Sequence, residues 1–168
     1  MTELSVAPLI EKLSDQLAPL FDGDNSPIMV GIETGGYRIA EQLHRRLQPD
    51  TELGKLNITF YRDDFTKIGL HPTVNPSSLP TDIDGKTIVL VDDVLYSGRT
   101  VRAAMNELFD YGRPERIVLV ILIDRGGREL PIQADFVGQT IELADDEQIK
   151  LEGDEQLTLN IQKIHAES

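Results

Sequence analysis

The segment 86–112, with the sequence KTIVLVDDVLYSGRTVRAAMNELFDYG, joins two kinds of element through a pair of acidic residues and a glycine loop. Its apolar run, Ile88–Val91, is short and rich in β-branched residues, which is typical of a strand buried on both faces. Asp92 and Asp93 follow that run directly, and the polar loop 96–100 comes next. The segment therefore predicts a strand, a carboxylate pair and a glycine loop that opens onto a helix.

The helix after this loop is predicted by its periodicity and by its ends. Apolar residues recur along 101–109 at the spacing of one helical face. Ser97 or Thr100 can serve as the N-cap, and Gly112 stands at the expected C′ position. Pro114 prevents the helix from resuming. This order brings the N-terminus of a helix close to the end of a strand.

Such an arrangement suits a particular kind of ligand. Unpaired N–H groups at a helix N-terminus attract a phosphate, and Gly98 lets the backbone approach it closely. Ser97 and Thr100 can add hydroxyl donors. Asp92 and Asp93 would repel the same phosphate, and they suit sugar hydroxyls or a magnesium-bearing ligand instead. A small molecule with a phosphate at one end and a diol or a metal at the other satisfies both halves.

The rest of the chain repeats the alternation of strand and helix. Helices are predicted over 6–17 and 39–47, and strands over 28–32, 56–61, 116–123 and 157–161. This alternation predicts an α/β fold with a mostly parallel, twisted sheet flanked by helices. Because no linker divides the 168 residues, we expect a single domain over 1–168. We interpret residues 145–155 as a solvated acidic surface.

Four polar groups follow the predicted strands, at 34–36, 62–64, 92–100 and 124–128. Ligands of parallel α/β sheets bind beyond the carboxyl ends of the strands, so we expect these groups to form one site.

The segment 65–84 contains three prolines and is too long for an ordinary connection. We expect it to be a flexible lid or a β-arm beside the site.

The charge balance limits the partners of the protein. There are 16 basic and 29 acidic residues, for a net charge of −13. Nonspecific nucleic-acid binding depends on Lys and Arg that neutralise phosphates, so RNA binding is possible but disfavoured.

The chain has no cysteine, which excludes disulfides and fits a reducing cytoplasm. We find neither a signal peptide nor an apolar run of membrane-spanning length, and we expect a cytoplasmic protein with no membrane partner.

Several other signatures fail on spacing. A Walker loop needs Gly where Asp93 stands and Lys where Arg99 stands, and the dinucleotide pattern G-x-G-x-x-G is absent. The three histidines lie far apart in the sequence, which disfavours a histidine metal site. Ser97 lacks the G-x-S-x-G elbow of acyl-transfer enzymes.

The sequence IVLVDDVLYSGRT, residues 88–100, resembles the phosphoribosyl-pyrophosphate (PRPP) motif of type I phosphoribosyltransferases. The segments 58–67, 91–108, 110–114 and 124–138 are similar to the PyrR family of bifunctional pyrimidine-operon regulators and uracil phosphoribosyltransferases. The resemblance implies the type I phosphoribosyltransferase fold: a mostly parallel twisted sheet flanked by helices, with a flexible loop or β-arm and a small hood.

The resemblance also implies a role for each polar group. Asp92 and Asp93 would hold the ribose hydroxyls and, with Arg62, form the catalytic set. The 5′-phosphate would be bound by Leu95, Tyr96, Ser97, Gly98, Arg99 and Thr100. Pyrophosphate would be bound by Thr34, Gly35, Gly36, Arg62 and Asp63. Uracil would be bound by Ile123, Asp124 and Arg125, where the base-binding loop and C-terminal region over 124–168 begin.

The implied reaction converts uracil and PRPP to UMP and pyrophosphate, as in pyrimidine salvage. Its cofactor would be Mg²⁺, carried on PRPP near Asp92 and Asp93. The alternative is an RNA-binding attenuation regulator of pyrimidine biosynthesis that senses UMP or UTP in the same pocket, with weak or no catalysis. We prefer the enzyme because the loop and lid segments are present and the net charge opposes RNA. The family also implies a homodimer or a higher homo-oligomer.

Overall fold

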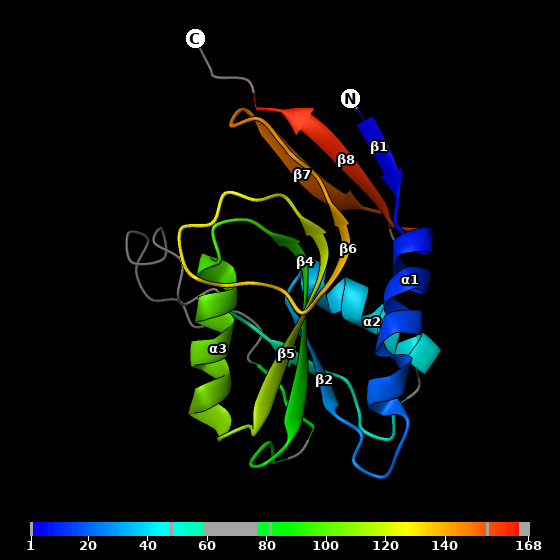
Figure 1. The fold of residues 1–168 in the computed structure, drawn as a ribbon, viewed down its shortest axis with the longest axis vertical. Coiled ribbons are helices and arrows are strands. Elements are labelled where there is room, and N and C mark those ends of the chain that lie inside the picture. The colour runs from blue at the N-terminus through cyan, green and yellow to red at the C-terminus, as the bar shows by residue number, and fades with distance from the viewer. Residues whose placement is uncertain (1, 48, 59–76, 81, 154, 165–168) are drawn as a thin grey trace.

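The computed structural model of the protein describes residues 2–47, 49–58, 77–80, 82–153 and 155–164. These residues form a five-stranded parallel sheet in the order β3-β2-β4-β5-β6 and a three-stranded antiparallel sheet in the order β1-β8-β7 (Figure 1). The strands of the parallel sheet are β2 (Ile28–Ile32), β3 (Gly54–Leu56), β4 (Thr87–Leu95), β5 (Arg116–Asp124) and β6 (Phe136–Thr140).

Helices cover both faces of the parallel sheet. They are α1 (Ala7–Leu17), α2 (Gly35–Leu47) and α3 (Arg99–Tyr111), and a short 3₁₀ turn, η1 (Ala18–Phe21), follows α1. In Figure 1, α3 lies on one side of the sheet and α1 with α2 on the other. The predicted α/β fold with a mostly parallel sheet is therefore confirmed.

The central strand β4 divides its side chains between the two helical layers. Val89 and Val91 pack in the cluster that includes residues of α1 and α2, whereas Ile88 and Leu90 pack in the cluster that includes residues of α3. All four side chains are fully buried. Burying one such aliphatic side chain stabilises the fold by about 1.5–3 kcal/mol, which explains why the run is apolar at every position.

The three-stranded sheet consists of β1 (Thr2–Ser5), β7 (Glu147–Glu152) and β8 (Thr158–Lys163). It lies at the end of the molecule where β4 and β5 finish (Figure 1). The interpretation of 145–155 as only a solvated acidic surface is wrong, because Ile149 and Leu151 of β7 pack against the core. These two residues alternate with polar ones in the period of a strand that is half buried.

The ends of the central elements differ from the sequence-based expectation. β4 continues through both aspartates to Leu95, and α3 begins at Arg99 after Gly98, whose backbone is left-handed. The N-cap is therefore Gly98, and the Ser97 hydroxyl accepts a hydrogen bond from the Arg99 N–H at 3.2 Å. Gly112 follows α3 as predicted, but its backbone is extended, and its lack of a side chain makes room for Asp84.

Part of the predicted structure falls outside the described residues. Of the strand predicted over 56–61, residues 59–61 are not described, and the same holds for 62–64 and most of 65–84. Within the described residues of that last segment, Ser78 forms an isolated bridge with Lys55. No helix among the described residues is long and apolar enough to cross a membrane.

Candidate active site

The acidic pair of β4 lies against the loop that opens α2. A Cβ atom on Gly35 would overlap the carboxylate of Asp93, and one on Gly36 would lie 2.5 Å from the Val91 carbonyl oxygen. Only glycine allows the chain to approach the carboxylates this closely. The structure thus brings the predicted pyrophosphate loop and the predicted ribose carboxylates together, although they are more than 50 residues apart in sequence.

Hydrogen bonds to the following backbone hold the two carboxylates in place. Asp92 Oδ1 accepts a bond from the Asp93 N–H, and Asp93 Oδ1 accepts one from the Val94 N–H, each at 2.8 Å. Asp92 is buried, with 5% of its surface exposed, whereas Asp93 is half buried. The two side chains therefore have different surroundings, and Asp93 is the more accessible to a ligand.

The phosphate loop, residues 95–100, follows at the end of β4. Together with neighbouring residues it lines a hollow of about 110 Å³ next to the N-terminus of α3. Gly98 has a left-handed backbone with φ of +95°, and a Cβ atom there would lie 3.1 Å from Ile132. The partial positive charge of a helix N-terminus makes this hollow suitable for an anion.

The carbonyl groups of the phosphate loop are bound by the segment 125–130. Leu95 O accepts a hydrogen bond from the Arg125 N–H at 3.1 Å, and Tyr96 O accepts one from Arg128 Nη1 at 2.9 Å. Ser97 O accepts bonds from the N–H groups of 129 and 130, at 2.9 and 3.1 Å. Because these carbonyls are taken up on one side, the loop can present its N–H groups on the other.

The predicted base-binding loop begins with Asp124 at the end of β5, the strand next to β4. Ile123 pairs with Val94, and Asp124 pairs with Leu95, so the predicted uracil residues lie beside the phosphate loop. Asp124 Oδ2 is 2.6 Å from the guanidinium of Arg128. Burial raises the pKa of Asp124, but hydrogen bonds from Arg128 and Gly126 and the charge of Arg128 outweigh it, so the pKa is lower than usual.

Tyr96 connects the two loops through its side chain. The guanidinium carbon of Arg125 lies 4.1 Å from the centroid of the Tyr96 ring, within the range of a cation–π contact. Gly127 has a φ of +80°, and a Cβ atom there would overlap the same ring. The roles of Gly127 and Arg128 are not predicted from the sequence, although the pattern D-R-G-G-R at the end of a buried strand indicates a loop with a defined shape.

Comparison with known proteins agrees with this geometry. A family model described as a phosphoribosyl transferase domain matches residues 2–156. The bifunctional protein PyrR of Nitrosococcus oceani is 56% identical over 142 residues, which are 83% of this chain and 80% of that protein. The bifunctional protein PyrR of Pseudomonas aeruginosa is 58% identical over 137 residues, which are 82% and 81% of the two chains. The chain belongs to the PyrR family of phosphoribosyltransferases.

Solved phosphoribosyltransferase structures share the fold. A hypoxanthine phosphoribosyltransferase from Staphylococcus aureus matches with a TM-score of 0.62 at 20% identity, over 82% of this chain and 73% of that one. A hypoxanthine-guanine phosphoribosyltransferase from Bacillus anthracis matches with a TM-score of 0.64 at 22% identity, over 82% of each chain. These similarities confirm the predicted type I phosphoribosyltransferase fold.

Phosphoribosyltransferases use Mg²⁺ with PRPP, and the acidic pair fits an ion that arrives on its substrate. No group of three or more His, Asp or Glu side chains that could hold a metal occurs among the described residues. Mg²⁺ in phosphate enzymes is commonly held by one or two carboxylates together with substrate oxygens, as Asp92 and Asp93 would allow. Arg62 and Asp63 lie outside the described residues, so their predicted roles remain predictions.

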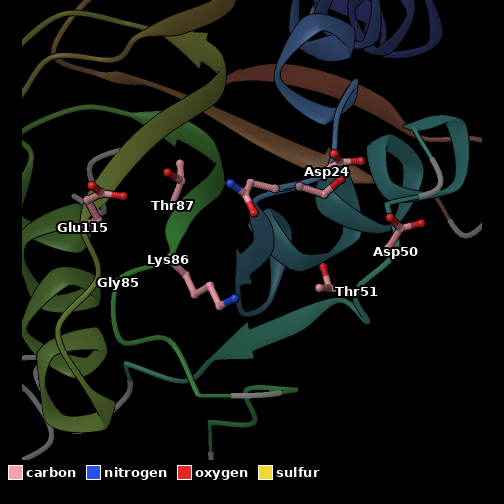
Figure 2. A pocket seen from close by; sticks show the side chains of 9 residues that line it. Asp24, Asp50, Thr51, Gly85, Lys86, Thr87 and Glu115 are labelled. Carbon is pink, nitrogen blue, oxygen red and sulfur yellow. The ribbon is translucent and has the colours of Figure 1, made fainter.

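A larger hollow of about 290 Å³ lies at the opposite edge of the sheet. It is lined by Lys86 just before β4, Thr87 at the start of β4, Glu115 just before β5, and the acidic residues Asp24 and Asp50 (Figure 2). The Lys86 side chain extends toward the middle of this hollow (Figure 2). Ligands of parallel sheets bind at the carboxyl edge, so the phosphate loop and not this hollow marks the candidate active site.

Proposed function

We propose that the protein is a uracil phosphoribosyltransferase, which converts uracil and PRPP to UMP and pyrophosphate. The observation that carries this proposal is the position of three groups at the carboxyl edge of one sheet. These are the carboxylate pair in β4, the phosphate loop before α3 and the base-binding loop after β5. We assign these groups to the ribose, the phosphate and the base of a single nucleotide.

The 5′-phosphate would lie at the N-terminus of α3, against the N–H groups of the phosphate loop and the hydroxyls of Ser97 and Thr100. Asp92 and Asp93 would accept hydrogen bonds from the ribose hydroxyls. As the anomeric bond breaks, positive charge develops on the ribose, and these carboxylates would stabilise it. Mg²⁺ carried on PRPP would supply positive charge beside the departing pyrophosphate.

The pyrophosphate would meet the loop 34–36 at the N-terminus of α2, with Arg62 and Asp63 as further ligands. This loop has an acidic neighbour, Glu33, whose carboxylate is 3.4 Å from Lys55 Nζ. The ion pair reduces the repulsion that a bare carboxylate would exert on pyrophosphate. Backbone N–H groups of the loop, rather than basic side chains, would then bind the leaving group.

Uracil would bind against Ile123, Asp124 and Arg125. The ionised carboxylate of Asp124 is an acceptor for a ring N–H, and the backbone at 123–125 offers both donors and acceptors. The test is a panel of nucleobases incubated with PRPP and Mg²⁺. Formation of UMP from uracil, with little product from hypoxanthine or guanine, is expected. Turnover of a purine base in place of uracil would refute the assigned base.

A second candidate function is RNA-binding regulation, and the observation in its favour is that the relatives reported above are named bifunctional. The net charge of −13 opposes it, since RNA affinity depends largely on basic residues. Titration with a pyrimidine-operon leader RNA at two salt concentrations separates the two functions. Tight binding that weakens steeply with salt would favour the regulator.

A further inference from the structure

Each of the three guanidinium nitrogens of Arg128 donates a hydrogen bond to a different acceptor. Nε donates to the Ile132 carbonyl at 2.9 Å, Nη1 donates to the Tyr96 carbonyl at 2.9 Å, and Nη2 donates to Asp124 Oδ2 at 2.6 Å. Its side chain is 25% exposed, and the bonds to Ile132 and Asp124 are partly buried, whereas the bond to the Tyr96 carbonyl is exposed. Arg128 itself lies in the segment after β5, and its bonds connect the phosphate loop to Asp124 at the start of the base-binding loop.

The bond to the Tyr96 carbonyl determines the direction of a neighbouring donor. The Tyr96 C=O and the Ser97 N–H belong to one planar peptide group and point in opposite directions. While Arg128 holds that carbonyl, the Ser97 N–H is turned away from Arg128. The carbonyls of Leu95 and Ser97 accept hydrogen bonds from backbone N–H groups of the segment 125–130. Within the part of the chain that the structure describes, the Arg128 guanidinium is therefore the one side-chain donor to the carbonyls of 95–97.

The bond to Asp124 fixes a carboxylate at the same time. Asp124 Oδ2 is bound by Arg128, and Oδ1 accepts a bond from the Gly126 N–H at 3.0 Å. With one bond on each oxygen, the plane of the carboxylate is defined, and its remaining lone pairs have definite directions. A ring N–H of a base can be recognised only if these directions are constant.

We propose that Arg128 is a positioning residue that orients the phosphate loop and the base-binding loop together. It contacts neither the phosphate nor the base; it acts through the Tyr96 carbonyl and the Asp124 carboxylate. This inference rests on the proposed function, since it assigns the two loops to the two halves of one nucleotide. Lysine cannot replace it fully, because a single ammonium nitrogen cannot reach three acceptors in the geometry of a planar fork.

The test compares Arg128→Ala with Asp124→Asn in steady-state assays of UMP formation. Asp124→Asn removes the ionised acceptor but leaves the guanidinium on Tyr96, so we expect its effect on the KM for uracil alone. Arg128→Ala loses both bonds, so we expect the KM for PRPP and the KM for uracil each to rise about tenfold, the effect of one charge-assisted hydrogen bond. Arg116→Gln, at an exposed position at the start of β5, is the matched control for loss of a positive charge.

Chemical rescue distinguishes positioning from a general effect on folding. Added guanidinium at concentrations far below denaturation should lower both KM values of Arg128→Ala, whereas the same concentration of sodium chloride should not. Arg128→Lys should fall between the wild type and Arg128→Ala. Thermal unfolding of each variant shows whether it is folded in the assay. If Arg128→Ala does not fold, Arg128→Lys and its two KM values provide the same comparison.

The outcomes separate the two proposals. If the wild type forms UMP and Arg128→Ala raises neither KM, or raises only the one that Asp124→Asn raises, the positioning role is refuted while the proposed function stands. If the wild type makes no UMP, the proposed function fails, and calorimetric binding of UMP takes the place of the assay. Weaker UMP binding in Arg128→Ala, with rescue by guanidinium, would still support the positioning role, and unchanged binding would overturn it.

Discussion

Replacing Gly127 by alanine should damage the site more than replacing Gly126 by alanine, although the two glycines have nearly the same backbone. Their φ angles are +80° and +76°, so an alanine at either position is strained by roughly 1–2 kcal/mol. At Gly126 nothing lies within 4 Å of the added Cβ atom, whereas at Gly127 that atom overlaps the ring of Tyr96. The pair therefore separates backbone strain from the contact with Tyr96.

The expected difference in stability between the two variants follows from the contact that the Tyr96 ring makes with Arg125. Tyr96 is 47% exposed, so we expect its ring to turn away from the added methyl group rather than to compress the loop. That movement removes the cation–π contact with Arg125, which is worth about 0.5–1 kcal/mol at an exposed site. For a chain of this size, 1 kcal/mol corresponds to roughly 2–4 °C in Tm. Gly126→Ala should lower Tm by about 2–8 °C, and Gly127→Ala by a further ~1–4 °C.

The assay is thermal unfolding by circular dichroism, together with the KM for PRPP of both variants. The turned ring no longer packs against Arg125 beside the phosphate loop, so Gly127→Ala should have the higher KM for PRPP of the two. Equal Tm values and equal KM values for the two variants would refute the reasoning, because the contact with Tyr96 would then have no energetic or functional weight.

Four further predictions concern other parts of the molecule. Asp93→Asn should abolish most UMP formation in Mg²⁺ without a large loss of Tm, and unchanged kcat/KM in that variant would contradict the assigned role of the carboxylate. Gly35→Ala should reduce kcat/KM because its Cβ atom displaces the same carboxylate. Gly85→Ala is strained by its φ of +71° but has nothing within 4 Å of the added Cβ atom, so it is the control for destabilisation that does not move that carboxylate. Leu108→Ala truncates a fully buried side chain of α3 and should lower the free energy of unfolding by about 2–5 kcal/mol in urea titrations. The pKa of Asp124 is lowered from its ordinary 3.8 in the folded state, so the ionised carboxylate stabilises the fold above that value. This stabilisation is lost as the pH falls through the folded pKa. The difference in free energy of unfolding between wild type and Asp124→Asn should therefore shrink between pH 7 and pH 3.

The sequence predicts the parallel sheet well because its strands are continuous apolar runs. Ile88–Val91 and the run in β5 can be buried only between two layers, and the helices between them have clear apolar faces. The strand β7 escapes prediction because its two apolar residues are surrounded by charged ones, and their burial depends on β8 and β1. Gly112 is predicted at the correct position, but as the C′ residue of the helix. The structure shows that glycine is needed there because Asp84 lies close to it, and that proximity is visible only in three dimensions.

The candidate site also contains some features that local sequence predicts and others that it does not. Asp92, Asp93 and the phosphate loop form one continuous stretch, so the pattern of residue types reveals them. The close approach of Gly35 to Asp93 and the bonds of Arg128 join segments that are distant in sequence, and no local pattern encodes them. The topology rule for parallel sheets predicts that such segments meet, but it does not specify which atoms touch.

The bonds between the two loops also bear on how base selectivity could change during evolution or in the laboratory. Of the four hydrogen bonds that the segment 125–130 donates to the carbonyls of 95–97, three come from backbone N–H groups and one comes from the side chain of Arg128. Backbone donors survive any substitution that preserves the path of the chain. A library that varies this loop to accept a different base could therefore change most of its side chains without weakening the hold on PRPP, provided that the guanidinium at 128 and the glycine at 127 are retained.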